Sequence, residues 1–537
     1  MSEEGARLDR GFSRAPYSLG GAAMIVGAAT LGSKLLGFAR DAVLSARFGA
    51  GTNSDAYITA SLLPITLFAA VGVSLTTVFI PLFSELVTRG DRARAEEFAA
   101  NVNGVATLVV AALVLLLELL AGPLLRVLEP HWVERRAIAV VLVRIMAPLI
   151  IFYAWSAVVG GVLNVRGFFG PNAAMGIPQN VVIIASMFVA TIGANRDISL
   201  VAWGSLVGTF TTYLIQLPAL RRSRFRVGWR LDFRDPLLAR MGRMALPAVA
   251  TAMAQQLGTL ASLFLGSRLP HGLITTFVLA GRLQLLAYSI LGMSISTVLY
   301  PSMARAVGRG DMGRFLQTFN RGLRLVNFVT LPVTVGLLLL RGPVVHVAYE
   351  HGQFTAQDAL DTIYPLIFLT LGTPLFAWLD YLNRAFFALQ DTRSPMIGAV
   401  LAVCSTILLD VLLVGPLRQG GLAIGSAAGW VTGATFLALR LRGRMGLLGG
   451  RQVVSSGVRV LAASIAGFLP AAWLAGPLAA RLGPEHWLTW VATLGVVGVL
   501  AATIYVGACW LFRVPELRGI AELVLARLRG RAGAEPA

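Results

Sequence analysis

Three cations lie inside long apolar stretches where membrane helices are expected. Lys34 and Arg40 occur in the first such stretch, and Arg282 occurs in a much later one. A charged side chain that faces lipid at the bilayer midplane costs at least about 2.5–3.5 kcal/mol, so we expect all three to face the protein interior. Guanidinium groups offer forked donors that match phosphate oxygens. The three cations therefore predict a positively charged cavity that binds a phosphate-bearing substrate.

Carboxylates near these cations allow a second interpretation. Asp41 directly follows Arg40 and shares a helix face with Lys34, and Asp55 lies shortly after this stretch. Each cation can instead pair with such a carboxylate or extend to the membrane interface. Arg282 has no evident carboxylate partner nearby in the sequence. We predict that all five residues belong to the substrate-binding site.

Two further polar pairs lie in later apolar stretches. Asp380 and Arg384 are one helical turn apart, which is the spacing of an intrahelical ion pair, so we predict a structural role for them. Thr406 and Asp410 share a helix face and supply oxygen ligands of the kind that a small cation prefers. They form a candidate ion-binding site, with a solvated aspartate near a helix end as the equally weighted alternative. Arg144 and Arg459 also fall inside predicted helices and receive no role.

The residues that most enzymes need are missing from the sequence. A phosphate-binding Walker loop requires a Gly-Lys pair, but the single lysine, Lys34, follows Ser33. The histidines form no HExxH motif and no close cluster of metal ligands. They lie near predicted external loops or helix ends, at His131, His271, His346, His351 and His486. We therefore expect a transporter with no metal and no cofactor, rather than an enzyme.

The composition predicts an all-α membrane protein that crosses the bilayer many times. The chain has 537 residues, of which 56% are hydrophobic and 13% are charged, whereas soluble domains carry about 25% charged residues. Runs of about 20 apolar residues, each long enough for one crossing, recur fourteen times. Six lie in the first part, at 22–47, 56–84, 98–122, 137–163, 173–194 and 198–220. Eight follow, at 244–267, 272–304, 325–348, 359–388, 395–414, 420–439, 457–479 and 487–512.

The distribution of arginine predicts the orientation of these crossings. Alternating the connections between two sides places 30 arginines on the side of both termini and 9 on the other, out of 45 basic residues. Cytoplasmic connections of membrane proteins are enriched in such residues, so both termini are predicted to be cytoplasmic. The connection 221–243 carries eight arginines and two aspartates. We expect it to contact anionic lipids rather than nucleic acid, because the charges flank helices and form no patch with aromatic platforms.

An internal repeat divides the chain into two similar lobes. Residues 60–81 match residues 280–301 without a gap, and the identical pairs include Gly72 with Gly292 and Pro81 with Pro301. Because six crossings separate the copies, both enter the membrane in the same sense, which implies two six-helix lobes related by an axis along the membrane normal. The predicted divisions are 1–21 (N-terminal segment), 22–220 (N-lobe), 221–243 (linker), 244–441 (C-lobe), 442–456 (linker), 457–512 (two final helices) and 513–537 (tail).

Several ordered motifs resemble the MurJ/MviN family of lipid II flippases, within the superfamily of polysaccharide exporters and multidrug/toxin antiporters. The motifs are 36–41 (LGFARD), 48–57 (FGAGTNSDAY), 78–81 (VFIP), 352–355 (GQFT), 388–395 (ALQDTRSP) and 420–423 (GGLA). The resemblance spans all fourteen predicted crossings. It implies a V of two six-helix lobes, a groove for a polyprenyl tail between the last two helices, and alternating access that carries an undecaprenyl-pyrophosphate-linked disaccharide-pentapeptide to the outer leaflet of the bacterial inner membrane.

The resemblance also assigns residues of a cationic central cavity. Arg40, Arg282 and Lys34 match its basic positions, and Asp55 matches an acidic one. Some members bind sodium through aspartates in the seventh and eleventh helices. Asp410 matches the latter, but serine stands at the former position, 262. Apolar residues also replace the basic residues that many relatives carry in the second helix, around positions 62 and 68. Membrane potential is therefore the favoured driving force.

Three alternatives remain open at this stage. An exporter of another polyprenyl-linked glycan would share the cationic site. A drug/cation antiporter would present acidic residues to its cavity and commonly has twelve helices. A membrane glycosyltransferase would need a carboxylate base. We expect the protein to act as a monomer.

Overall fold

The computed structural model describes residues 19–193, 196–446, 449–482 and 487–517. All regular secondary structure in these ranges is helical, which confirms the predicted all-α fold. Residues 1–18, His486 and 518–537, for which predictions were made above, lie outside the described residues. The chain divides into two compact units, Met1–Gly272 and Leu273–Ala537.

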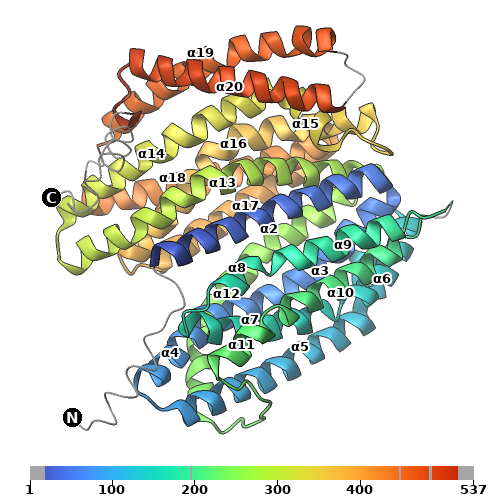
Figure 1. Cartoon of the computed structure of the whole chain (residues 1–537), viewed down its shortest axis with the longest axis vertical. Coiled ribbons are helices and arrows are strands. Elements are labelled where there is room, and N and C mark those ends of the chain that lie inside the picture. The colour runs from blue at the N-terminus through green and yellow to red at the C-terminus, as the bar shows by residue number, and fades with distance from the viewer. Residues whose placement is uncertain (1–18, 194–195, 447–448, 483–486, 518–537) are drawn as a thin grey trace. The chain divides into compact units, whose positions relative to one another are not determined.

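The first unit contains most of the short helices (Figure 1). Its elements are α2 (Leu19–Phe48), α3 (Thr52–Ser74), η1 (Leu75–Phe79), α4 (Ile80–Thr88), α5 (Arg92–Leu128), α6 (Val133–Met146), α7 (Leu149–Val165), α8 (Gly170–Ala174), α9 (Gly176–Val189), α10 (Ile198–Leu214), α11 (Leu217–Ser223) and α12 (Pro236–Gly266). The predicted crossing 137–163 is two helices, because Pro148 lacks the amide hydrogen that a continuous helix would use.

The second unit is built from longer helices. Its elements are α13 (Leu273–Gly308), α14 (Met312–Leu339), α15 (Arg341–Tyr349), α16 (Ala356–Ala388), α17 (Arg393–Leu417), α18 (Gln419–Met445), α19 (Gly450–Leu482) and α20 (Trp487–Leu511). The last two helices pack against each other, because Gly467 of α19 lets the α20 backbone at Ala501 and Tyr505 approach closely.

Ten helical stretches in the described residues are long and apolar enough to cross a membrane. Three of them combine two consecutive helices, α6 with α7, α8 with α9, and α10 with α11. The other seven are the single helices α5, α14, α16, α17, α18, α19 and α20. Helices α2, α3, α12 and α13 coincide with four further predicted crossings. The multi-pass membrane fold is thereby confirmed, and the total of fourteen crossings stays a prediction.

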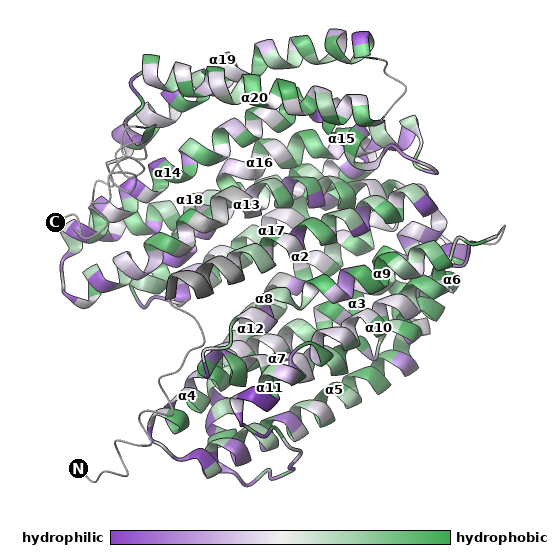
Figure 2. Ribbon diagram, in the orientation of Figure 1, coloured by the Kyte–Doolittle hydropathy of each residue, from purple (hydrophilic) through white to green (hydrophobic). Residues whose placement is uncertain are grey.

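Large apolar side chains cover the outer faces of these helices. Leu119 of α5 is 67% exposed and Val499 of α20 is 69% exposed, and Figure 2 shows hydrophobic residues along most helices with hydrophilic residues concentrated near their ends. Such surfaces are stable against hydrocarbon, where a helix satisfies its own backbone hydrogen bonds. The arrangement therefore fits a bilayer and not water.

The sequence repeat extends into two matching turns. Gly90 and Gly310 both adopt left-handed backbone conformations, with φ of 79° and 72°, after a helix has ended. The next residues, Asp91 and Asp311, each accept a hydrogen bond from an amide three residues later and so cap α5 and α14. These turns are also 220 positions apart, so the two units use the same local signals to reverse the chain.

The two copies of the repeat differ in helix geometry. The first contains the π-helix η1, Leu75–Phe79, whereas the second runs through α13 as one α-helix. The widened turn ends two residues before Pro81. Proline cannot donate a backbone hydrogen bond and crowds the preceding turn, and a π-turn is one way to accommodate it. Pro301 lies at the equivalent place without such a turn.

Helix α12, the seventh predicted crossing, groups with the first unit. It packs on α3 and α5. Its N-cap Asp235 binds Arg94 and Asn101 of α5. The carbonyl of Ser267, which follows the last residue of α12, accepts a hydrogen bond from Arg135 of α6. Both ends of α12 are therefore tied to helices of the first unit.

Candidate functional site

The first predicted cation cluster lies on α2. Nε and Nη2 of Arg40 both donate to one oxygen of Asp41, at 3.1 and 2.8 Å. Among the described residues, Lys34 forms no ion pair. Helix α2 thus carries two cations against one carboxylate between residues 34 and 41. The predicted alternative, a local pair with Asp41, is correct for Arg40, yet one positive charge remains.

The Arg40 pair leaves part of the guanidinium available. Two of its five N–H donors are occupied by Asp41, and the Arg40 side chain keeps 24% of its surface exposed. Asp41 is more enclosed, at 12%. A pair of this kind can orient the guanidinium and still present N–H groups to another oxygen, as a phosphate-binding arginine requires.

Small residues hold α2 against the neighbouring helices α8 and α9. The Cβ atom that a substitution would add at Gly176 would overlap the Ser33 side chain. The Asn180 amide of α9 donates to the Ser33 carbonyl at 3.4 Å, and Gly37 lies beside the same asparagine. This close approach fixes the helix from which Lys34 and Arg40 project.

A buried charge network surrounds Asp55 at the start of α3. The Arg135 guanidinium of α6 donates to Glu129 at 2.6 and 3.0 Å and to Asp55 at 3.2 Å. The side chains of all three are 0% exposed. Asp55 also accepts the Gly272 amide at 2.7 Å, and Thr59 donates to Glu129. Burying charges is stable only when they are paired and hydrogen-bonded in this way.

This network joins three connections of the first unit. Asp55 follows the α2–α3 connection, Glu129 lies in the α5–α6 connection, and Gly272 ends the connection that follows α12. All three are predicted to lie outside the cytoplasm. Burial raises the pKa of Glu129 above its ordinary value, although Arg135 opposes the shift. Asp55 is enclosed by protein groups, and a direct contact with substrate stays a prediction.

Sequence reasoning missed Arg135 and Glu129. Both lie near the end of a predicted crossing, where charged residues are ordinarily solvated, and their partner Asp55 is 80 positions from Arg135. The one available signal was a short connection with opposite charges on either side of Trp132, whose ring lies 5.8 Å from the Arg135 guanidinium. That signal does not reveal burial.

The second unit contains the remaining predicted residues. Arg282 is exposed on α13. The structural pair of Asp380 and Arg384 on α16 is confirmed, at 3.3 Å, and Tyr288 of α13 also donates to Asp380, at 3.0 Å. Because Lys34 and Arg40 belong to the first unit and Arg282 to the second, their convergence on one cavity stays a prediction.

Thr406 and Asp410 lie on one face of α17, against α18. Asp410 is fully buried. Glycines at 425 and 429 of α18 let the helices approach, because added Cβ atoms would overlap the Asp410 and Thr406 side chains. The described residues contain no cluster of three or more His, Cys, Asp or Glu side chains able to hold a metal ion. Ion binding by this pair is untested.

The fold is that of a multi-pass α-helical membrane protein with charged side chains inside its apolar helices, and two solved structures share it. A solved structure described as a lipid II flippase MurJ in an inward closed conformation has a TM-score of 0.75, at 23% identity, over 93% of this chain and 100% of that one. A multidrug resistance MATE family transporter of the MOP superfamily, inward-facing, has a TM-score of 0.68 at 14% identity over 78% and 96%.

Sequence comparison defines the family. The family model described as lipid II flippase MurJ matches residues 44–491. A probable lipid II flippase MurJ of Rhizobium meliloti (strain 1021) is 30% identical over 470 residues, covering 84% of this chain and 87% of the relative. One from Vibrio cholerae is 26% identical over 417 residues, covering 75% and 79%. The chain therefore belongs to the MurJ family of lipid II flippases, as the motifs in its sequence predicted.

Proposed function

We propose that this protein carries lipid II, an undecaprenyl-pyrophosphate-linked disaccharide-pentapeptide, from the inner to the outer leaflet of the bacterial inner membrane. Membership of the MurJ family supports the substrate class. The observation that carries the mechanism is the excess positive charge on α2, where Arg40 presents a partly exposed guanidinium and Lys34 has no ion-pair partner within the described residues. An exposed Arg282 completes the proposed set.

The chemistry of the crossing follows from the cost of desolvation. A diphosphate cannot enter hydrocarbon unaided, because unpaired charges lose their hydration there. Charge-assisted hydrogen bonds from Lys34, Arg40 and Arg282 replace that hydration while the polyprenyl tail stays in the bilayer. Alternating access of the two lobes then exposes the headgroup to the other side, and no covalent bond changes.

The direction of transport is proposed to come from the membrane potential. The pyrophosphate linkage is anionic, so a potential that is positive outside favours its outward movement. Serine stands at position 262, where the resemblance places an aspartate of sodium-binding relatives, so sodium is not assigned. We also propose that the protein acts as a monomer, with both termini cytoplasmic and the arginine-rich segment 221–243 near anionic lipids.

The test is rescue of bacteria depleted of their own flippase. Arg40→Ala and Arg282→Ala are expected to abolish rescue, because each removes a phosphate-binding cation. Arg144→Ala is the matched control, since this arginine also lies in an apolar helix and is exposed but has no assigned role. Membrane levels and monodispersity of each variant must equal those of wild type. Full rescue by both Arg40→Ala and Arg282→Ala contradicts the proposed mechanism.

The substrate is tested separately with purified protein in liposomes. Labelled lipid II in the inner leaflet is expected to become accessible to an amine-modifying reagent that cannot cross the membrane. Another polyprenyl-linked glycan without the pentapeptide is compared at equal concentration, with its own leaflet-specific label. Faster transfer of that glycan would identify an exporter of a different substrate and contradict the assignment.

A further inference from the structure

The arginine-rich segment between α11 and α12 is bound to the side of α5 along several residues. The Arg230 amide donates to the Ala100 carbonyl at 3.1 Å, and the Asn101 side chain exchanges hydrogen bonds with the backbone of Asp232. Asn103 donates to the Gly228 carbonyl at 3.1 Å. The segment is therefore held in an extended path by backbone and amide contacts.

Gly104 permits a close approach of the segment to α5. A Cβ atom at this position would overlap the Arg230 carbonyl oxygen. Immediately beyond this contact, the segment and the helix border an open pocket of about 430 Å³, lined by Gly104, Thr107, Leu108, Ala111, Trp229, Arg230 and Leu231. This volume falls within the range of small-molecule sites, about 300–1,000 Å³.

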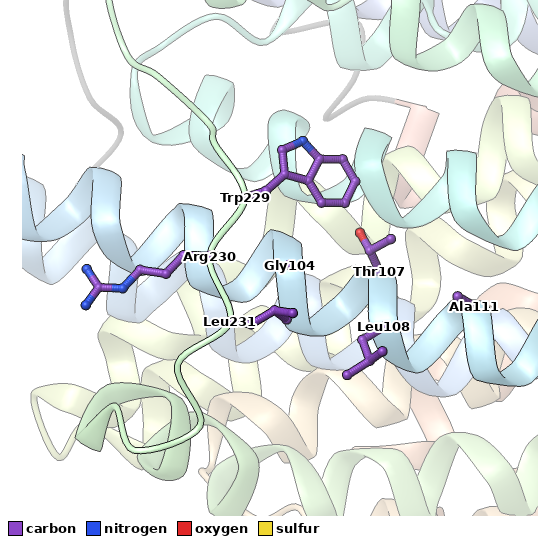
Figure 3. A pocket seen from close by; sticks show the side chains of 7 residues that line it. All are labelled: Gly104, Thr107, Leu108, Ala111, Trp229, Arg230 and Leu231. Atoms are coloured by element: carbon purple, nitrogen blue, oxygen red, sulfur yellow. The ribbon is translucent and has the colours of Figure 1, made fainter.

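The pocket wall is held in place even though it lies at the surface. The Trp229 ring, 58% exposed, stands edge-on to Trp155 with ring centres 5.3 Å apart. Trp155 in turn donates to the Thr107 hydroxyl at 3.0 Å. Figure 3 shows the Trp229 ring above Thr107, with Leu108 and Ala111 further along α5. The tryptophan is thus fixed by neighbours that are independent of any ligand.

The pocket is amphipathic along the direction of the helix. Leu108 and Ala111 are exposed on an apolar membrane-spanning helix, so they face acyl chains. In Figure 3 the Arg230 side chain extends the opposite way, toward the beginning of α5, where it pairs with Glu97 and with Asp232, each at 3.3 Å. Both pairs are exposed, and exposed ion pairs exchange readily with other partners. The pocket therefore has an apolar end that fits a lipid tail and a cationic end that fits its headgroup.

We propose that this pocket binds one anionic phospholipid of the inner leaflet, with an acyl chain against Leu108, Ala111 and Trp229 and its phosphate at Arg230. The choice of an anionic lipid rests on charge, since residues 221–243 carry eight arginines and two aspartates. The exposed Leu231 and Phe233 place the segment at the membrane interface. The site depends on the proposed cytoplasmic orientation of this segment and uses none of the residues that are proposed to bind lipid II.

The test is photo-crosslinking of full-length protein in nanodiscs. Phosphatidylglycerol with a photoreactive group in its acyl chain is expected to label residues 104–111 and 229–231. Phosphatidylcholine with the same group is expected to label them about fivefold less, because one arginine near the surface contributes about 1 kcal/mol to the binding of an anionic lipid. Ala111→Trp fills the pocket and should remove the labelling. Arg230→Gln should reduce the preference for phosphatidylglycerol about fivefold, whereas the matched control Arg234→Gln, in the same segment but outside the pocket, should retain it.

Several outcomes overturn the proposal. Equal labelling by both lipids removes the charge selectivity, and labelling that survives Ala111→Trp shows that the lipid lies elsewhere. Displacement by added lipid II assigns the pocket to the substrate. If Ala111→Trp does not fold, the comparison of Arg230→Gln with Arg234→Gln decides. Lipid II flipping by all variants is measured in parallel, so that loss of the lipid site and failure of the flippase assignment give different results.

Discussion

Removal of Arg135 tests the buried network most severely. Its guanidinium makes four hydrogen bonds, to Glu129 twice, to Asp55 and to the Ser267 carbonyl. Arg135→Ala leaves two carboxylates without their cation in a site where the side chains are 0% exposed. Breaking a buried pair in this way costs about 3–5 kcal/mol. We expect the free energy of unfolding to fall by that amount.

The assay is reversible unfolding of purified protein in mixed micelles, followed by loss of helical circular dichroism. Arg144→Ala is the control, because this residue lies on the same helix but is exposed, and surface substitutions change stability by about 0.5 kcal/mol or less. The triple variant Arg135→Met, Glu129→Gln, Asp55→Asn removes all three charges together and should recover most of the loss. A cost below about 1 kcal/mol for Arg135→Ala would refute the burial of this network.

Three further predictions concern other parts of the molecule. Burial alone would raise the pKa of Asp235, but the Leu237 amide, Arg94 and Asn101 hold it below its ordinary value of 3.8. The anchoring of segment 227–235 by this carboxylate is therefore complete above pH 3.8 and is lost as the pH falls through the lower folded value. Hydrogen exchange of the segment will detect this pH dependence, which Asp235→Asn should abolish. Gly425→Val should lower the free energy of unfolding by about 1–3 kcal/mol, because the added atoms overlap Asp410. If a denaturation series shows an unchanged free energy of unfolding, the packing of α17 on α18 is contradicted. A potential of 100 mV, positive outside, should favour outward transfer of about two negative substrate charges by about 4.6 kcal/mol. The distribution of lipid II between leaflets is measured in liposomes with a potassium diffusion potential. A distribution that does not change with the potential would exclude voltage as the driving force.

The sequence predicts the helical membrane fold well because each crossing of the hydrocarbon core needs about 20 consecutive, mostly apolar residues. Helices of water-soluble proteins do not need such a stretch. Local pairs are also accessible, since Asp380 and Arg384 need only helical spacing to meet. The internal repeat locates equivalent turns, but it does not show that Leu75–Phe79 widens into a π-helix whereas the equivalent part of α13 does not. Hydropathy does not register that difference in backbone geometry.

Long-range pairing accounts for what the sequence did not predict. Arg135 meets Asp55 and Glu129 only because three separate connections come together in the folded first unit. Likewise, the arginines between α11 and α12 predict a charged surface, but the pocket under Trp229 depends on the close approach that Gly104 allows. Residue types and spacing along one chain do not encode such contacts in a form that can be read without the structure.

The central claim is that Lys34, Arg40 and Arg282 bind the pyrophosphate of lipid II. The most direct measurement is the affinity of purified protein for lipid II by native mass spectrometry, with inorganic pyrophosphate as competitor. We predict that pyrophosphate competes with lipid II and that Lys34→Gln, Arg40→Gln and Arg282→Gln each weaken binding at least tenfold, whereas Arg144→Gln does not. Unchanged affinity in all three variants would contradict the claim.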